Sequence, residues 1–519
     1  MKPITYSLSA CCFVLLGIAA VPGAPAKGAP TAKKVIPTFA KDIAPILYSK
    51  CARCHHQGEV APFNLMSYED ARAKAPTLAT AVSQKYMPPW QAVSHGEFAN
   101  ERTLSSAEIQ TFVEWAKAGA PKGDLSHAPK PPTYTLGWGM GTPDFVGKPG
   151  KSYSVDAEGE DVYRCFVVPT SFDEDRWVTA IEVRPGNHRV VHHVLVYLDK
   201  SGTARKRDGE DGKPGYTSFG GPGFLPVGAL GGWVPGIDYQ SLPAGEGFLL
   251  PKGADIVMQV HYHKDGKPET DLTQIGLQFA KVPIDKHVRW DSVDNEIISI
   301  KPGDSHYEVK ADLIVPTAVT VLDVIPHMHW IGHDMTVTAT YPDGTSRQLI
   351  HVEPYDFNWQ TRYVYKEPVH LPKGTRLDLV AHYDNSTANP HNPSNPPKPV
   401  VFGEQTTNEM CFAFFTYTID SEHLTQGISG GDDKAMLAGK RKSMLRKMFD
   451  NFDVNHDGFL DETELTNAIA YFRDMSPKGD KSVQDPAKAA KLVITFFGKT
   501  EKGKISFEEF QKMASSQLK

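Results

Sequence analysis

The chain has 519 residues, of which 40% are hydrophobic and 22% are charged. A single hydrophobic core rarely serves so long a chain, so several domains are expected, and the composition is ordinary for soluble globular protein. The formal net charge is −6, and there is no basic stripe or polybasic tail, which argues against nucleic acid or an anionic membrane as a partner.

Residues 1–26 predict an export signal. Lys2 gives a positive start, residues 12–21 form an apolar run too short to span a bilayer, and residues 24–26 are small enough for cleavage. A lipoprotein site at Cys11 is the alternative, although this cysteine precedes most of the apolar run. No later segment is long and apolar enough for a transmembrane segment, so we expect a periplasmic or secreted protein.

The remaining chain divides into regions of different pattern. A helical region at 37–125 is followed by a Pro/Gly linker at 126–150, and short β-rich runs separated by turns extend from 151 to 425. The length of this all-β region suggests two sandwiches rather than one. A helical pattern returns at 434–519.

The motif Cys51-Ala-Arg-Cys54-His55 predicts covalent attachment of a c-type haem. Its spacing places two thiols against the haem vinyl groups and the histidine on the iron. A redox dithiol or half of a zinc site is the alternative, but the chain has no second cysteine pair and no thioredoxin-like βαβ pattern around the motif. Its flanks resemble small class I cytochromes, so we expect a cytochrome c domain at 37–125.

Met87, in the run 87–90, is the best candidate for the second iron ligand, because a thioether suits iron and raises its potential. Met66 is the second choice, and a packing role for Met87 stays open. A domain of this kind carries electrons without selecting a substrate.

Three histidine motifs lie in the β region, at His192-His193, His261-Tyr-His263 and His327-Met-His329. Residues i and i+2 of a strand share a face, so His327 and His329 can converge on one metal. His192 and His193 can do so only where the strand ends or bulges. Imidazole ligands favour copper, zinc, iron or nickel, and a thioether favours copper(I).

Together with the run Asn408-Glu-Met-Cys411, these motifs resemble the copper type II ascorbate-dependent monooxygenases, the family of the peptidylglycine α-hydroxylating and dopamine β-monooxygenases. Segments 161–165 and 242–248 resemble the family as well. The resemblance implies two jelly-roll sandwiches that face each other across a wet cleft, each with one copper. It implies two ligand sets: His192, His193 and His261 for an electron-storing copper, and the catalytic His327, His329 and Met410 for the copper that meets oxygen.

A zinc site that adds His333 to the second set, or a cupin-like His-x-His site, is the competing interpretation. Neither explains the His-His pair or Met410. His263 also faces the same way as His261 in an extended strand.

Three positions depart from relatives that act on glycine-extended peptides. Those relatives hold the substrate carboxylate with arginine, asparagine and tyrosine where this chain has Ile325, Phe412 and Phe414. Without a buried arginine to pair with a carboxylate, peptide amidation is not expected, and a neutral or apolar substrate fits better.

Of the six cysteines, Cys165 and Cys411 remain after the signal and the haem motif are set aside. They fall in different sandwiches, so we expect two buried free thiols, with a bridge between them as the alternative.

The segment 453–464 has the pattern of an EF-hand loop, with Gly458 at the turn. The expected calcium ligands are Asp453, Asn455, Asp457, Phe459 (through its carbonyl), Asp461 and Glu464. A second hand at 498–509 lacks oxygen side chains at several ligand positions and should pair structurally while binding calcium poorly. A stabilising role is favoured over a switch at extracellular calcium levels.

The sequence therefore predicts a helical cytochrome c domain, an N-terminal copper-binding β-sandwich at 151–285, a C-terminal one at 286–425 and an α-helical EF-hand pair. Its cofactors are expected to be two coppers, haem c and calcium. The predicted function is a copper-dependent monooxygenase that uses O2, a small-molecule substrate and an external electron donor, with the haem as relay. A non-catalytic electron-transfer or redox-sensing protein is the alternative, and a zinc-dependent hydrolase is a third hypothesis.

Overall fold

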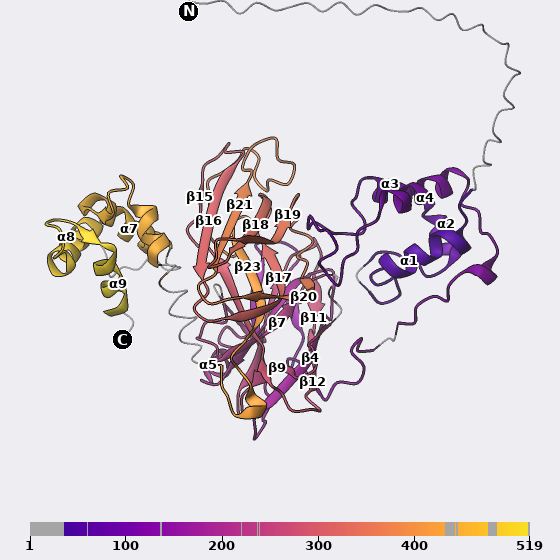
Figure 1. Cartoon of the computed structure of the whole chain (residues 1–519), viewed down its shortest axis with the longest axis horizontal. Coiled ribbons are helices and arrows are strands. Elements are labelled where there is room, and N and C mark those ends of the chain that lie inside the picture. Colours follow the sequence, from indigo (N-terminus) through magenta and orange to yellow (C-terminus); the bar gives the residue numbers. More distant parts are fainter. Residues whose placement is uncertain are drawn as a thin grey trace, which may run out of the picture.

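The computed structural model describes residues 36–516, apart from residues 60, 135–136, 219–220, 236, 238, 431–441, 443–444 and 476–484. The predicted export signal lies outside the described residues. Figure 1 shows a helical N-terminal region and a helical C-terminal region on opposite sides of a central region of β-strands. The molecule is therefore multidomain and mostly β.

The N-terminal helices enclose a small apolar core. Its last helix begins at a capping box, in which the Ser105 hydroxyl accepts the Glu108 N–H at 3.2 Å while the Glu108 carboxylate accepts the Ser105 N–H at 2.7 Å. Phe112 and Trp115 of this helix are fully buried. The elements are η1 (Phe39–Ile43), α1 (Ala44–Lys50), α2 (Tyr68–Ala73), α3 (Ala75–Ser83), α4 (Ser106–Lys117) and η2 (Leu125–His127).

The first β-sandwich consists of two larger sheets that share one core. One sheet has the order β1-β12-β4-β9-β13, with β8 also on β4, and the other has the order β6-β3-β10-β5-β7; a short pair, β11-β2, lies beside them. The strands are β1 (Phe145–Gly147), β2 (Tyr153–Val155), β3 (Val162–Val168), β4 (Arg176–Arg184), β5 (Val191–Asp199), β6 (Tyr216–Thr217), β7 (Gly228–Trp233), β8 (Gln240–Ser241), β9 (Glu246–Leu250), β10 (Asp255–Tyr262), β11 (Glu269–Asp271), β12 (Gln274–Phe279) and β13 (Lys286–His287), with the short helix α5 (Thr203–Arg207) after β5.

The second β-sandwich also has two sheets around one core, in the orders β14-β23-β17-β20 and β16-β21-β18-β19. Along β16, Val309, Ala311 and Leu313 are buried while their neighbours are more exposed, which is the alternation of a strand with one face on a core. The strands are β14 (Arg289–Asp294), β15 (Ser299–Ile300), β16 (Tyr307–Ile314), β17 (Val319–His327), β18 (Gly332–Thr340), β19 (Ser346–Val352), β20 (Tyr363–Leu371), β21 (Arg376–Tyr383), β22 (Val400–Val401) and β23 (Phe412–Ile419), followed by η3 (Leu424–Gln426).

The segment between α3 and α4 departs from the predicted helical domain. It contains no helix, and it lies on the second sandwich through isolated bridges of Ala92 with Val352 and of Phe98 with Tyr365. Phe98 is almost completely buried there and belongs to the core of that sandwich. The range 37–125 is therefore not one helical body, because apolar side chains in its connecting segment find a larger core to join.

The C-terminal helices form a pair of hands around their own core. The two loops pair through β24 (Phe459–Leu460) and β25 (Ile505–Ser506), as calcium-binding loop pairs do. Helical residues 445–452 precede α7 (Glu462–Met475), α8 (Pro486–Phe497) and α9 (Phe507–Ser516). The Lys447 ammonium reaches the sandwich by donating to the Asp294 carbonyl at 2.6 Å.

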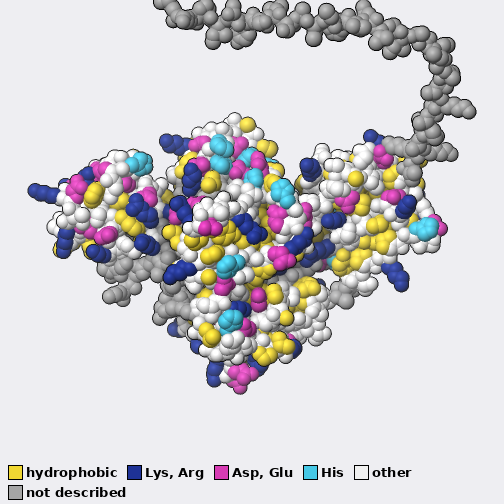
Figure 2. Space-filling view, viewed as in Figure 1, with side chains coloured by type: hydrophobic (Ala, Val, Ile, Leu, Met, Phe, Trp, Pro, Cys, Tyr) yellow, Lys and Arg dark blue, Asp and Glu magenta, His cyan; other side chains and the backbone are white. Residues whose placement is uncertain are grey.

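The part of the surface seen in Figure 2 carries acidic and basic side chains side by side, without a large patch of either sign. Within the described residues, no helix combines the length and the apolar character needed to cross a membrane.

Candidate metal centres and the cavity between them

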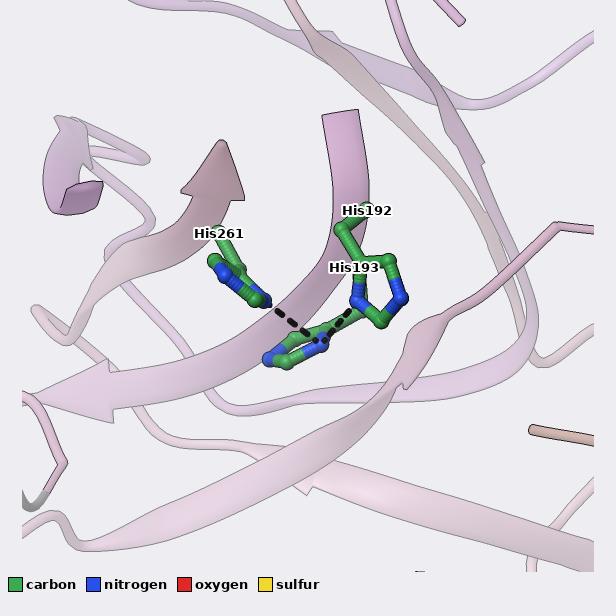
Figure 3. A group of neighbouring side chains, drawn as sticks. All are labelled: His192, His193 and His261. Carbon is green, nitrogen blue, oxygen red and sulfur yellow. Dashed lines mark hydrogen bonds between the residues drawn. The ribbon is translucent and has the colours of Figure 1, made fainter. Parts of the chain in front are cut away.

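The first histidine set forms at a bulge at the start of β5. In the pairing of β5 with β10, His193 lies opposite His261 while the next pair joins Val191 to Tyr262, so His192 is the extra residue of the bulge. This irregularity lets neighbouring residues turn to the same side, as the sequence required. Figure 3 shows His192, His193 and His261 converging, with Nδ1 of His193 at 3.3 Å from that of His192 and 3.4 Å from that of His261.

These three side chains are suited to hold a metal ion. One ligand atom from each lies within 4.8 Å of the others, and among the described His, Cys, Asp and Glu side chains no other group of three or more does so. Burial, followed by the neighbouring imidazoles, holds the pKa of His192 and of His193 well below the ordinary value. The rings are therefore neutral, which is the form that binds a metal.

Asp161 orients the first set from behind. Its carboxylate lies 3.2 Å from Nε2 of His261 and 3.0 Å from Nδ1 of His263, and it accepts the Thr406 hydroxyl at 2.7 Å. Burial alone would raise the pKa of Asp161, but its bonds to the two histidines and Thr406 bring it below the ordinary value. With Nε2 held by this carboxylate, the Nδ1 atom of His261 is left for the metal. His263 is half exposed and contacts Asp161 instead of joining the set.

The second pair, His327 and His329, closes the end of β17 and the turn after it. Nδ1 of His327 donates to the Gln360 side-chain oxygen at 2.9 Å, and Nδ1 of His329 donates to the Asn408 carbonyl at 3.1 Å. These bonds leave both Nε2 atoms as acceptors for a metal. Burial, opposed by the bond to Gln360, lowers the pKa of His327 to about 4, so this ring is also neutral.

Met410 lines the same cavity as His327 and His329. It is positioned by Glu409, a fully buried carboxyl that accepts N–H groups from His329 at 2.8 Å, Ile331 at 2.9 Å and Met410 at 3.2 Å. The Met410 carbonyl in turn accepts the Tyr383 hydroxyl at 2.8 Å. One side chain thus joins the histidine turn to the methionine loop, which keeps the three predicted ligands together.

The competing zinc site would need His333 beside His327 and His329. His333 is half exposed and its Nδ1 contacts the Asp334 carboxylate at 2.9 Å. It lies at the register irregularity of β18, between Gly332 and Asp334, and it is not among the described side chains that line the cavity.

The two histidine sets lie closer together than the resemblance implied. The ring centroids of His193 and His327 are 6.3 Å apart, and the Phe357 ring stacks on His192 at 4.5 Å while meeting His329 edge-on at 5.4 Å. The expected wet cleft is instead a contact between the sandwiches, because an aromatic side chain fills the space between the two sets.

A cavity of about 100 Å³ remains beside the two sets. It is lined by His193, His327, His329 and Met410 and by apolar side chains from both sandwiches: Val194, Leu195, Trp233, Val234, Ile237, Trp290, Ile325 and Phe414. The predicted apolar positions Ile325 and Phe414 lie opposite each other on paired strands, and Phe412 lies opposite His327.

Cys51, Cys54 and His55 follow directly on α1. Nδ1 of His55 donates to the Phe63 carbonyl at 3.0 Å, which leaves Nε2 for a metal. Burial, with the neighbouring Cys54, raises the pKa of the Cys51 thiol to about 12. A reactive dithiol needs a lowered thiol pKa, so this environment does not suit a redox pair. Met87 is half-buried beyond the end of α3, and its predicted place on the iron stays a prediction.

The first EF-hand loop has its ligand side chains turned inward. Backbone N–H groups of Asp457 and Gly458 donate to the Asp453 carboxylate, and those of Val454 and Asn455 donate to Glu464. Lys504 of the second hand reaches across, with its ammonium 2.5 Å from the Asp457 carboxylate. Cys165 and Cys411 are buried thiols without a disulfide, as expected.

Several residues of these sites lie outside the sequence motifs. Gln360 and Phe357 lie in the connection before β20, and Trp233 ends β7, so only the fold brings them to the histidines. Asp161, whose carboxylate contacts His261 and His263, lies in the segment 161–165 that resembles the family, but no role was predicted for it from the sequence.

The structure has two β-sandwiches and two neighbouring histidine clusters, and His193, His327 and His329 of these line a largely apolar cavity. Residues 303–436 match the family model described as copper type II ascorbate-dependent monooxygenase, C-terminal domain, and residues 442–515 match the EF-hand domain pair. The first match contains His327, His329 and Met410, and the second contains the whole loop 453–464. These matches suggest a copper-dependent, monooxygenase-like protein with a calcium-binding tail.

Known proteins give no further support. No curated protein matches the chain. The solved structures that resemble it include the VP2 subviral particle of infectious bursal disease virus, with 10% identity over 57% of this chain and 76% of that chain at a TM-score of 0.16. Another is a two-domain protein of unknown function from Bacteroides fragilis, with 9% identity over 52% of this chain and 93% of that chain at a TM-score of 0.14. Such TM-scores carry no argument about fold or function.

Proposed function

We propose that this protein is a copper-dependent monooxygenase that hydroxylates a C–H bond of a small, non-peptide substrate. The observation that carries the proposal is the convergence of His192, His193 and His261 beside a second histidine pair. The rings of His193 and His327 are 6.3 Å apart, and both line one largely apolar cavity with His329 and Met410. The balanced reaction converts R–H, O2, two electrons and two protons into R–OH and water.

The donor atoms fit copper in both sets. Three imidazole nitrogens tolerate both oxidation states, and the thioether of Met410 favours copper(I). Copper bound there would supply one-electron chemistry toward O2. The chain's own contribution is to hold the imidazoles neutral, to fix their tautomers through Asp161, Gln360 and the Asn408 carbonyl, and to exclude water with the surrounding apolar side chains.

We further propose that haem c bound at Cys51, Cys54 and His55 passes electrons from an external donor toward this cavity. Arg53, between the two cysteines, lines a small cavity together with Ile237 and Tyr239. Ile237 and Trp233 also line the cavity of His193, His327 and His329, and Trp233 pairs with Val194, the neighbour of His193. Ile237 thus lines both the cavity that Arg53 lines and the cavity that His193 and His327 line, which supports a short path between them.

An oxidising location agrees with this proposal. Haem attachment through thioethers and a calcium-binding tail both suit a periplasmic or secreted protein, and the predicted signal at 1–26 would direct export.

Metal content and oxygen uptake test the proposal together. Purified protein is expected to bind two coppers, and its reduced form is expected to consume O2 faster when a substrate is present. Met410→Leu, which conserves volume and removes the thioether, is expected to abolish the substrate-dependent uptake while the first copper is retained. Met335→Leu, at a buried methionine in the core of the same sandwich, is the control and is expected to keep full uptake.

Zinc in place of copper would favour a hydrolase. Two coppers without substrate-dependent uptake across a broad set of small molecules would favour the non-catalytic electron-transfer or redox-sensing function.

A further inference from the structure

Trp290 and Phe414, which line the cavity, belong to a row of parallel aromatic rings. The rings of Trp290 and Phe414 stack at 4.6 Å with 11° between their planes, and those of Phe414 and Phe412 stack at 5.3 Å with 15°. They stand on the neighbouring strands β14 and β23, and Phe414 reaches to 6.2 Å of the His327 ring. A flat apolar surface therefore leads directly to the predicted oxygen-side ligands.

This row lies on the outer face of its sheet. Ala413 and Phe415, which alternate with it along β23, are buried in the core of the second sandwich, whereas Phe412, Phe414 and Trp290 stay half-buried. Large aromatic side chains on the face opposite the core need another partner to cover them. Trp233, Val234 and Leu195 of the first sandwich face these rings across the cavity and cover them only in part.

Several polar groups that line the cavity have hydrogen-bond partners in the protein. Nε2 of Gln259 donates to the carbonyls of Ser218 and Gly221, Gln360 serves His327, and the Tyr163 hydroxyl donates to the Glu404 carbonyl. No lysine or arginine is among the described residues that line it. Glu404 is the one carboxylate there, and it accepts the Gly221 N–H at 3.2 Å. An anionic ligand would lose its hydration without gaining an opposite charge, and a cationic ligand would meet only the Glu404 carboxylate.

We infer that the substrate is a neutral, planar aromatic molecule of about one ring that lies against Trp290 and Phe414. That the bound molecule is a substrate rests on the proposed function. Its binding in the cavity does not depend on turnover. The cavity volume of about 100 Å³ is smaller than the engineered apolar cavity of about 150 Å³ that binds benzene, so it limits the ligand to about one ring. Parallel rings at these distances favour a further ring stacked or edge-on against them.

Binding of simple hydrocarbons tests the inference. Full-length, copper-loaded protein is kept free of oxygen so that no turnover occurs, and free ethylbenzene or ethylcyclohexane is measured by headspace gas chromatography. The two probes have the same number of carbon atoms and differ in planarity. Ethylbenzene is expected to bind about two- to tenfold more tightly, which is the effect of one aromatic pair. Equal or weaker binding of ethylbenzene overturns the inference.

Phe414→Leu is expected to remove most of this preference, because it keeps an apolar side chain and deletes the ring. Phe172→Leu is the matched control, since Phe172 is a half-buried phenylalanine that contacts Phe145 and Phe279 away from the cavity. The control is expected to keep the preference of the unmodified protein. Thermal unfolding of both variants establishes that they are folded. Loss of the preference for ethylbenzene in both variants would contradict the assignment of Phe414 to the binding surface.

Charged analogues test neutrality. In competition with ethylbenzene, 2-phenylethylamine and N-benzoylglycine are expected to bind more weakly than ethylbenzene. Tighter binding of the amine, lost in Glu404→Gln, would instead assign a cationic substrate and overturn the inference.

The outcome for the proposed function is separate. If ethylbenzene binds to copper-loaded protein but neither it nor a broad set of small molecules stimulates oxygen uptake, the monooxygenase is contradicted and the binding site stands. Oxygen uptake with another substrate, in protein that does not bind ethylbenzene, contradicts the substrate class alone.

Discussion

At the scale of single residues, the partners of the histidines decide which nitrogen faces the metal. In the first set the Nδ1 atoms converge, and Asp161 holds Nε2 of His261. In the second set Gln360 and the Asn408 carbonyl hold the Nδ1 atoms, so Nε2 is left. The sequence motifs predict the ligands but not this choice of nitrogen, because the hydrogen-bond partners come from distant loops.

Asp161→Asn is expected to weaken copper binding at the first set roughly 10- to 100-fold, the usual effect of losing a carboxylate behind a metal-binding histidine. The affinity for copper(I) is measured by competition with a chromogenic chelator. Asp285→Asn is the control, because Asp285 makes a similar contact with His423 at 2.9 Å outside the site. Equal affinities in the two variants would show that Asp161 has no part in holding the metal.

Lys504→Gln is expected to raise the calcium affinity of the first EF-hand roughly two- to fivefold, the range of an exposed ion pair. The ammonium of Lys504 lies 2.5 Å from the predicted ligand Asp457 and competes with a cation there. Calorimetric titration measures the change. Lys491→Gln, which removes a contact with the non-ligand Glu462, is expected to leave the affinity unaltered.

At the scale of elements, the bulge in β5 determines whether the first site exists. A regular strand would send His192 and His193 to opposite faces, and the observed register inserts His192 as an extra residue. The need for a bulge followed from the His-His pair itself. Its position opposite His261 and Tyr262 did not, since register depends on which strands pair.

Deletion of His192 is expected to restore regular pairing between β5 and β10, keep the sandwich folded and reduce bound copper from two ions to one. His192→Ala keeps the bulge and removes only the ligand, so it separates loss of the imidazole from loss of the register. Copper content by elemental analysis and folding by circular dichroism are the measurements. A deletion variant that still binds two coppers would show that the bulge is not required.

At the scale of the whole molecule, the sequence predicted two sandwiches, the ligand sets and the calcium loop. It did not predict how closely the sandwiches meet, because that distance is set by side chains such as Phe357, which lies between His192 and His329 although far from both in sequence. The sequence pattern also assigned the segment at 86–103 to the helical domain, because contacts between distant residues cannot be derived from the local pattern. Its composition does not reveal that Phe98 enters the core of the second sandwich.

Trp233→Leu is expected to slow the oxidation of reduced haem by copper(II) several-fold. Trp233 lines one cavity with His56, next to the haem motif, and another with His193, and it pairs with Val194 of β5. Stopped-flow absorbance at the haem bands follows the reaction without a substrate. Trp177→Leu, at a half-buried tryptophan that contacts His287 instead, is the control. The relay proposal fails if both variants transfer electrons at the rate of the unmodified protein.

The bridges that fasten Ala92 and Phe98 to the second sandwich have a kinetic consequence. They are reinforced by hydrogen bonds between Asn100 and the backbone of Arg362 and Val364, which lie on and beside β20. A separate donor protein must find its acceptor by diffusion, so its delivery rate falls on dilution and changes with salt. A donor that is part of the same chain delivers in a first-order step. Under the proposed haem relay, internal electron delivery is therefore expected to have the same rate at nanomolar and micromolar protein, and dilution is expected to slow only the arrival of electrons from outside.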